Sequence, residues 1–163
     1  MPVQVADNVY WVGAIDWNVR DFHGYTYTTP RGTTYNAYLI VDDQVALVDT
    51  VAPGFEDEML ARIREVIDPA QIRYLIANHG EIDHSAAIPY VLDLAPQAEL
   101  ICSRKGTESL DHYHPELSQF HTVVTGDTLR LGKKTLSFVE APMLHWPDSM
   151  FTYVAQDRLL LPN

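Results

Sequence analysis

Four side chains that can bind a metal ion fall within six consecutive positions of this sequence. They are His79, Glu81, Asp83 and His84, with Gly80 between the first two. In an extended or turning loop alternate residues point the same way, so His79, Glu81 and Asp83 can converge on one point. The glycine lets the backbone pass close to an ion. We therefore interpret the segment as a metal-binding loop.

The mixture of ligand types narrows the choice of ion. One imidazole with two carboxylates favours iron or manganese at a higher coordination number, and two carboxylates permit two ions that share bridging oxygens. The single cysteine, Cys102, excludes an internal disulfide and any four-thiolate site within the chain. The alternative is a solvated turn in which Asp83 is the N-cap of the following helix.

A second candidate ligand, His145, lies in the segment 143–149 at the predicted end of a strand. The first cluster also follows a strand, so both segments can open on the same edge of the fold. A lone histidine is more often structural than metal-bound, but beside the first cluster His145 becomes a candidate ligand. The remaining histidines that match no motif are expected on the surface: His112, His114 and His121.

The elements that must position these residues alternate strands with helices after an all-β opening. Apolar patterns and turn residues predict a mixed sheet covered by helices. Between the first strand pair and the next hairpin, residues 14–34 show no sustained period and are expected to form a long loop lying on the domain. The expected strands cover 3–12 (a pair), 36–41, 45–49, 73–77, 99–102, 123–124, 129–131, 135–140, 150–155 and 158–161, and the expected helices 55–66, 85–94 and 104–112.

Composition excludes several classes of protein. The sequence has 22 Asp and Glu against 11 Lys and Arg, a formal net charge of −11, which repels nucleic acids and anionic membrane surfaces and favours metal cations as partners. No stretch approaches the roughly 20 apolar residues that span a bilayer. The N-terminus shows no signal peptide, so we expect a cytoplasmic protein.

The two candidate segments together resemble a known family. The pattern His79-x-Glu81-x-Asp83-His84, followed by His145-Trp-Pro-Asp-Ser, is similar to the metallo-β-lactamase-like half of the flavodiiron proteins, or A-type flavoproteins, which include rubredoxin:oxygen oxidoreductases. Glu81 is the discriminating residue, because hydrolytic relatives that bind zinc have histidine there. The opening segments that also resemble the family are 12–17, 21–25 and 32–38.

The resemblance implies a fold and a domain organisation. We expect an α+β metallo-β-lactamase-like αβ/βα sandwich over residues 1–163, incomplete at its C-terminal side, with its first half and the start of its second half present. The family's flavodoxin-like domain, which binds FMN, is absent from this sequence.

The resemblance also implies a role for each site residue. His79, Glu81 and His145 would hold one iron, and Asp83 would hold the other. The position of His84 binds iron in some members of the family and not in others. Residues implied near the oxygen-binding pocket or behind the ligands are His23, Tyr25 and Trp146, and Asp49 would brace the ligand loop from the end of its strand. For His23 and Tyr25, aromatic packing of the long loop is the alternative.

The implied activity of the intact protein is reduction of O₂ to water, of NO to N₂O, or of both, by two irons. Electrons would pass through FMN from a small carrier such as rubredoxin, within a homodimer. Family members continue beyond position 163 with a bridging aspartate and a further histidine. We therefore expect this chain alone to hold two irons poorly or not at all, and to be inactive without a partner. The alternatives are a zinc hydrolase of the same superfamily and a non-catalytic truncated fragment. No residue here distinguishes O₂ from NO.

Overall fold

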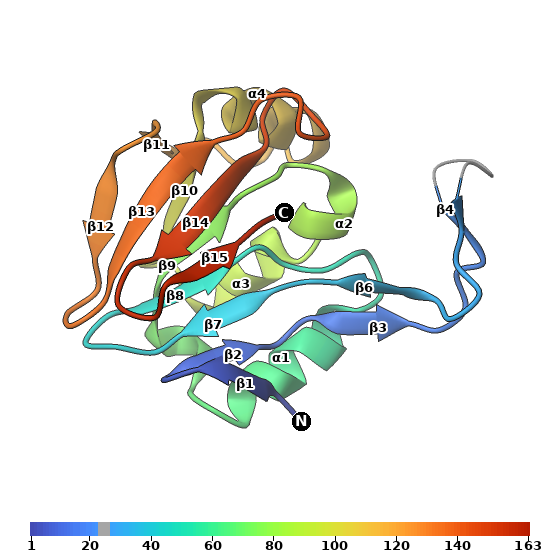
Figure 1. Cartoon of the computed structure of the whole chain (residues 1–163), viewed down its shortest axis with the longest axis horizontal. Helices are drawn as coiled ribbons and strands as arrows, with labels where there is room; N and C mark the ends of the chain where they lie inside the picture. Colours follow the sequence, from blue (N-terminus) through green and yellow to red (C-terminus); the bar gives the residue numbers. More distant parts are fainter. Residues whose placement is uncertain (23–26) are drawn as a thin grey trace.

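A computed structural model describes residues 1–22 and 27–163, and its largest element is a mixed seven-stranded sheet (Figure 1). The strand order is β1-β2-β7-β8-β9-β10-β11. Pairs from β1 to β8 are antiparallel, whereas β8, β9, β10 and β11 run parallel. The strands are β1 (Val3–Ala6), β2 (Val9–Trp11), β7 (Tyr38–Ile40), β8 (Val45–Val48), β9 (Ile72–Ala77), β10 (Glu99–Ser103) and β11 (His121–Val123).

A second sheet of four antiparallel strands covers one face of the first, and helices cover the other. Strand β8 shows why, because its neighbouring residues point to opposite faces. Leu47 packs with the buried residues of the helices, while Ala46 and Val48 pack with the inner side chains of the second sheet. The four strands are β12 (Thr128–Arg130), β13 (Thr135–Glu140), β14 (Met150–Val154) and β15 (Leu159–Leu161). The central strand is therefore buried on both faces, as its continuous apolar run predicts.

Helix α1 shows how the local sequence specifies a covering helix. It bears acidic residues in its first turn and arginines in its last, which complements the helix dipole, and it buries Met59, Leu60 and Ile63 on one side. The helices are α1 (Glu56–Arg64), α2 (Ile82–Ser85), α3 (Ile88–Leu94) and α4 (Arg104–Tyr113), with a short 3₁₀ helix, η1 (Pro69–Gln71). None of the helices in the described part of the chain is long and apolar enough to cross a membrane.

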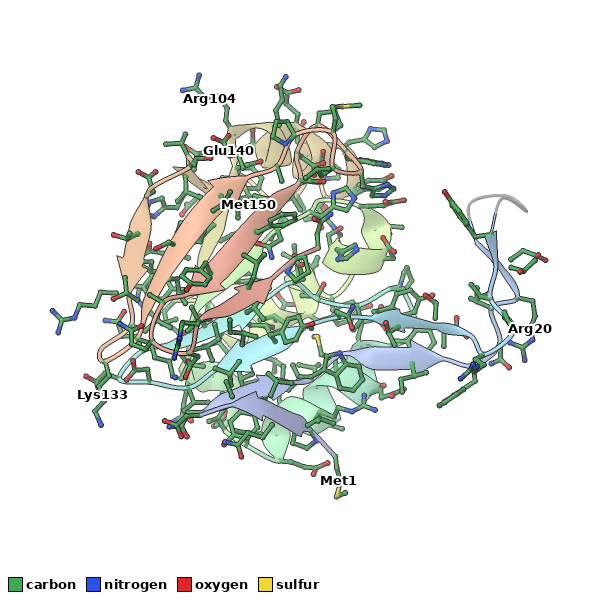
Figure 2. All side chains as sticks on the ribbon, viewed as in Figure 1. Met1, Arg20, Arg104, Lys133, Glu140 and Met150 are labelled. Carbon is green, nitrogen blue, oxygen red and sulfur yellow. The ribbon has the colours of Figure 1, made fainter. Side chains whose placement is uncertain are left out.

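The prediction of a long loop over residues 14–34 is wrong. Strands β3 (Ala14–Asp16) and β6 (Thr33–Tyr35) form an antiparallel ribbon, and β4 (Asp21–Phe22) pairs with β5 (Tyr27–Thr28). The β3–β6 ribbon runs along the body, with Ala14 and Tyr35 in the core, and the β4–β5 pair projects beyond it, with Arg20 near its base (Figures 1 and 2). The pairs are only two and three residues long, so they leave little alternation to detect in the sequence.

Candidate metal centre

The ends of three parallel strands place candidate site residues at one edge of the large sheet. Asp49 follows β8, His79 lies two residues beyond β9, and Ser103 ends β10. The carboxyl ends of parallel strands meet at the same edge, where ligands of such sheets are commonly held. The hydroxyl of Ser103 donates to the carbonyl of Asp148 (2.8 Å), which fastens the loop before β14 to this edge.

Glu81 lies between two histidines from distant parts of the sequence. One carboxylate oxygen, Oε2, is 3.1 Å from His79 Nε2 and 3.2 Å from His145 Nε2. One ligand atom from each of the three residues lies within 4.8 Å of the other two. Two imidazole nitrogens facing one carboxylate oxygen make a donor set suited to a transition-metal ion such as iron.

Asp148 fixes the orientation of His79. Both of its carboxylate oxygens are 3.1 Å from His79 Nδ1, and the backbone N–H of Gly80 donates to Oδ2 (2.8 Å). The carboxylate can only accept, so Nδ1 carries the hydrogen and Nε2 is directed toward Glu81. A carboxylate behind a metal-binding histidine acts in this way, because it holds the ring and its tautomer.

The same contacts shift the pKa values of the pair. Burial lowers the pKa of the His79 imidazole, but the hydrogen bond and the charge of Asp148 outweigh burial and raise it above its usual value. Burial raises the pKa of Asp148, yet the bonds from His79 and Gly80 bring it below its usual value. The raised pKa of His79 means that a proton competes with a metal ion for Nε2 more strongly than at a free imidazole, so metal binding there should depend on pH.

Asp49 and His84 form a second pair beside the first. Asp49 is buried, accepts from the backbone N–H of Asn78 (2.7 Å), and lies 3.7 Å from His84 Nδ1. Burial lowers the pKa of His84, but the adjacent Asp49 outweighs burial and raises it. Burial is also the largest influence on Asp49 and raises its pKa. The pair therefore retains a proton more firmly than either group would in water.

Asp83 is not a member of the group formed by His79, Glu81 and His145. The predicted convergence of Asp83 with His79 and Glu81 is therefore not seen. Asp83 lies in α2, which begins at Ile82, so the loop has already turned into a helix and alternate residues no longer share a direction. It is not the N-cap either, since Glu81 holds that position without a side-chain bond. Asp83 Oδ2 is 4.0 Å from His84 Nε2.

One atom of this region supports a fit to a further cation. Among the buried side-chain atoms of the described residues, Asp83 Oδ1 lacks a hydrogen-bond partner, and such an atom is costly unless a ligand completes it. His84 Nδ1 also lacks a hydrogen bond, but it faces the Asp49 carboxylate at 3.7 Å. Asp83 and His84 line a hollow of about 320 Å³ with Glu81 and His145. The other residues of its wall are Thr33, Thr34, Asn36, Leu144 and Asn163.

The loop that carries His145 is held in an uncommon backbone conformation. His145 has φ 104° and Met143 φ 65°, and Asp49 on the facing strand end has φ 56°. Residues other than glycine seldom adopt positive φ, and such strain concentrates at functional sites. Trp146 packs edge-on against the ring of His79, with centroids 5.1 Å apart. The loop thus positions His145 as a candidate ligand, and its Trp146 covers the ring of His79.

The structure brings most of the predicted site residues to one edge of the sheet. His23 and Tyr25 lie outside the described residues. Sequence reasoning gave no role to Asp148, although it stands three positions after His145. The sequence could have suggested a role for Asp148, because a metal-binding histidine commonly donates its second N–H to a carboxylate.

His112 and His121 are exposed as expected, but His114 is buried, so the expectation of a surface position is wrong for His114.

Comparisons with known proteins identify relatives of this chain. The sequence profile described as "ODP family beta lactamase" matches residues 33–162. The chain is 52% identical over 163 residues to a nitric oxide reductase of Moorella thermoacetica, covering 99% of this chain and 41% of that protein. It is 46% identical to an anaerobic nitric oxide reductase flavorubredoxin of Salmonella arizonae, covering 100% and 34%. It superposes on the rubredoxin oxygen:oxidoreductase of Desulfovibrio gigas with TM-score 0.94 and 43% identity, covering 100% and 41%.

The fold and the edge-of-sheet cluster define a metallo-β-lactamase-like domain, which confirms the expected fold class. The chain belongs to the flavodiiron family and corresponds to the N-terminal, ODP-type domain of its members. It spans between about a third and two fifths of the length of the relatives named above.

Proposed function

We propose that residues 1–163 form the iron-binding domain of a flavodiiron reductase of O₂, NO or both. The observation that supports this most is that Nε2 of His79 and Nε2 of His145 both face Oε2 of Glu81. The relatives named above are nitric oxide reductases and a rubredoxin oxygen:oxidoreductase, and their activities define the proposal. The FMN-binding flavodoxin-like domain, a rubredoxin-type electron donor, a homodimer and a cytoplasmic location belong to the same proposal.

In this proposal His79, Glu81 and His145 hold one iron, while Asp83 and His84 face the second. Bound at these residues, two irons would bind the diatomic substrate and pass to it the electrons that arrive through FMN. Asp148 holds the His79 ring so that Nε2 faces the site, and Asp49 holds the backbone N–H of Asn78 at the start of the ligand loop. The buried positions of both carboxylates keep these bonds away from competing water.

Part of the lining of the hollow is neutral and polar. Asn36 accepts a hydrogen bond from Trp11 Nε1 through Oδ1 (3.0 Å), which leaves its NH₂ group as a donor. Thr33 and Thr34 supply hydroxyls to the same lining. These groups can donate hydrogen bonds to a ligand held in the hollow beside Glu81 and Asp83.

An anaerobic titration of the chain with Fe²⁺, followed by exposure to O₂, tests the proposal. We expect at least one Fe²⁺ to bind per chain, to be oxidised on exposure to O₂, and to be lost in His145→Ala. His121→Ala is the matched control, because His121 is an exposed histidine outside the site. Retention of zinc in preference to iron, with hydrolysis of an ester, thioester or lactam, would support the hydrolase instead. Binding of no metal would support the non-catalytic fragment.

A further inference from the structure

The peptide unit around Gly80 joins two candidate ligands and is fastened on both sides. Its N–H donates to Asp148 Oδ2 (2.8 Å), and its C=O accepts from the hydroxyl of Ser85 (3.0 Å). Ser85 is fully buried. Because Gly80 lies between His79 and Glu81, the orientation of its backbone sets the directions in which both side chains leave the loop. The contact with Asp148 is part of the candidate metal centre. The contact with Ser85 connects Gly80 to residues outside that centre.

A buried histidine lies behind Ser85. His114 Nε2 is 3.1 Å from Ser85 Oγ, and the residue is only 6% exposed. The single hydroxyl hydrogen of Ser85 is donated to the Gly80 carbonyl, which can only accept. Ser85 Oγ must therefore accept from His114, so Nε2 carries a hydrogen. The bonds form a directed chain from His114 through Ser85 to Gly80.

The backbone of His114 is fixed at the end of α4. Its N–H donates to the carbonyl of Leu110 (2.7 Å), and its own carbonyl accepts from Leu117 (2.9 Å). Its Nδ1 lies 3.6 Å from a carboxylate oxygen of Glu116. The donor end of the chain is thus held by main-chain bonds and is independent of the loop that it contacts.

Helix α4 also contacts Gly80 directly. A Cβ atom built on Gly80 would lie 2.6 Å from Ser109 Cβ and 3.3 Å from the backbone nitrogen of Leu110, so the loop lies against the helix with no space between them.

The contacts from Ser85 to His114 and from His114 to Glu116 resemble those of a hydrolase catalytic triad. Full burial of Ser85 and donation of its hydrogen to Gly80 exclude a nucleophilic role in this conformation.

We propose that His114 is a positioning residue of the metal centre, which acts through Ser85 to orient the Gly80 carbonyl and thereby the ligand loop. This inference rests on the proposed function in one respect, namely that His79 and Glu81 hold a metal ion. Partners behind metal ligands typically change metal affinity by about 10- to 100-fold when they are removed. Loss of His114 should have an effect of that size without any contact between His114 and the metal.

The first measurements use the metal-free chain of 163 residues. Long-range ¹H–¹⁵N NMR should show the Nε2–H tautomer of His114, and a bare Nε2 would overturn the proposal. In His114→Ala, hydrogen exchange of the amides of Gly80 and Glu81 should accelerate about tenfold or more, while β9 and β10 exchange as before. His112→Ala is the matched control, since His112 is an exposed histidine of the same helix. His114→Gln keeps an N–H near the same place and should restore slow exchange.

The second measurement is the Kd for Co²⁺ as the metal probe. His114→Ala and Ser85→Ala should each weaken Co²⁺ binding by about 10- to 100-fold. The double variant should be no weaker than the worse single one, because both act through the same contact. Additive losses, or equal Kd values for His114→Ala and His112→Ala, would overturn the positioning role and leave the metal site standing. If the unsubstituted chain binds no Co²⁺ while exchange still accelerates in His114→Ala, the proposed function fails and the positioning of the loop stands.

Discussion

At the scale of single residues, Glu81 decides which ion the candidate site favours. Among the described residues, the group of His79, Glu81 and His145 holds one carboxylate, that of Glu81, and an imidazole nitrogen of each histidine faces its Oε2. A carboxylate favours harder cations, whereas a third imidazole would make the set resemble a zinc site. The charge of Glu81 also offsets that of the ion, which neutral imidazole cannot do.

We predict that Glu81→His raises the preference for Zn²⁺ over Fe²⁺ by tenfold or more. The substitution replaces the single oxygen ligand with nitrogen and leaves His79 and His145 unchanged. Competition titrations of the two ions under anaerobic conditions measure the ratio of Kd values. Glu81→Gln is the control, because it removes the charge without adding an imidazole and should weaken both ions together. An unchanged ratio in Glu81→His would mean that Glu81 does not contact the ion.

The pair of Asp148 and His79 makes the stability of the metal-free chain depend on pH. The raised pKa of His79 gives stability that is complete below about 6.5, its ordinary value, and that is lost as the pH rises through the raised value. The lowered pKa of Asp148 gives stability that is present above about 3.9 and lost as the pH falls through the lowered value. The contribution of the pair is therefore largest between about pH 4 and pH 6.5.

We predict that Asp148→Asn lowers the free energy of unfolding by about 1–3 kcal/mol at pH 5.5 and by less at pH 8, because a charge-assisted hydrogen bond is replaced by a neutral one. Urea unfolding with a chelator present measures the free energy at both pH values. Asp157→Asn is a control, since Asp157 pairs with Lys134 away from the site. An equal loss at both pH values would show that His79 does not titrate against Asp148. His84 keeps Asp49 in this variant, so part of the pH dependence should persist.

At the scale of elements, Asn78 ties the end of β9 to the second sheet. Its side chain donates to the carbonyl of Leu161 (3.0 Å) and accepts from the hydroxyl of Thr152 (2.8 Å). Its own carbonyl accepts from the backbone N–H of Met150 (2.9 Å). Each contact joins β9 to β14 or β15, and the residue is fully buried. The next residue is His79, so this junction fixes where the ligand loop starts.

We predict that Asn78→Ala lowers the free energy of unfolding by about 2–4 kcal/mol, because it leaves the buried carbonyl of Leu161 and hydroxyl of Thr152 without partners. Chemical denaturation in a chelator measures this loss. Gln97→Ala is a matched control: its exposed amide also donates to two backbone carbonyls, and its removal should cost under about 1 kcal/mol because water replaces it. Equal losses in the two variants would contradict the role of Asn78 as the junction between the sheets.

At the scale of the whole molecule, a bound ion would join the two sheets. His79 and Glu81 follow β9 of the large sheet, while His145 precedes β14 of the small one. In Figure 1, α2 lies beside the end of the chain, and Asn163 lines the same hollow as Glu81. An ion held there links segments that are separated by more than sixty residues. Metal binding should therefore stabilise the fold as a whole.

We predict that Fe²⁺ at about 100 times its Kd raises the free energy of unfolding by about 2.7 kcal/mol, as mass action requires. The gain should disappear in His145→Ala and on addition of a chelator, and it should persist in His121→Ala. Anaerobic urea unfolding with and without Fe²⁺ measures the difference. An undiminished gain in His145→Ala would show that the ion does not join the two sheets.

Much of this architecture could be predicted from local patterns. The strand pair at 3–12, the hairpin that became β7 and β8, α1, β9, β10 and the later strands were all predicted within a few residues, because burial on one or two faces repeats along the chain. The predicted loop at 14–34 was wrong because its pairs are too short to show a period. The predicted helix at 85–94 instead begins at Ile88, after the short turn α2 that contains Asp83.

The chemical types at the candidate centre follow from the amino-acid sequence alone. Imidazoles and carboxylates at 79, 81, 83, 84 and 145 limit the ligands that can bind, whatever the fold. Which side chains meet depends on the packing of distant segments: His145 reaches Glu81, Asp148 reaches His79 across 69 positions, and His114 reaches Ser85. Local spacing sets the direction of a side chain within one strand or helix. Packing of the two sheets and α4 sets distances between segments, and no local pattern encodes those distances.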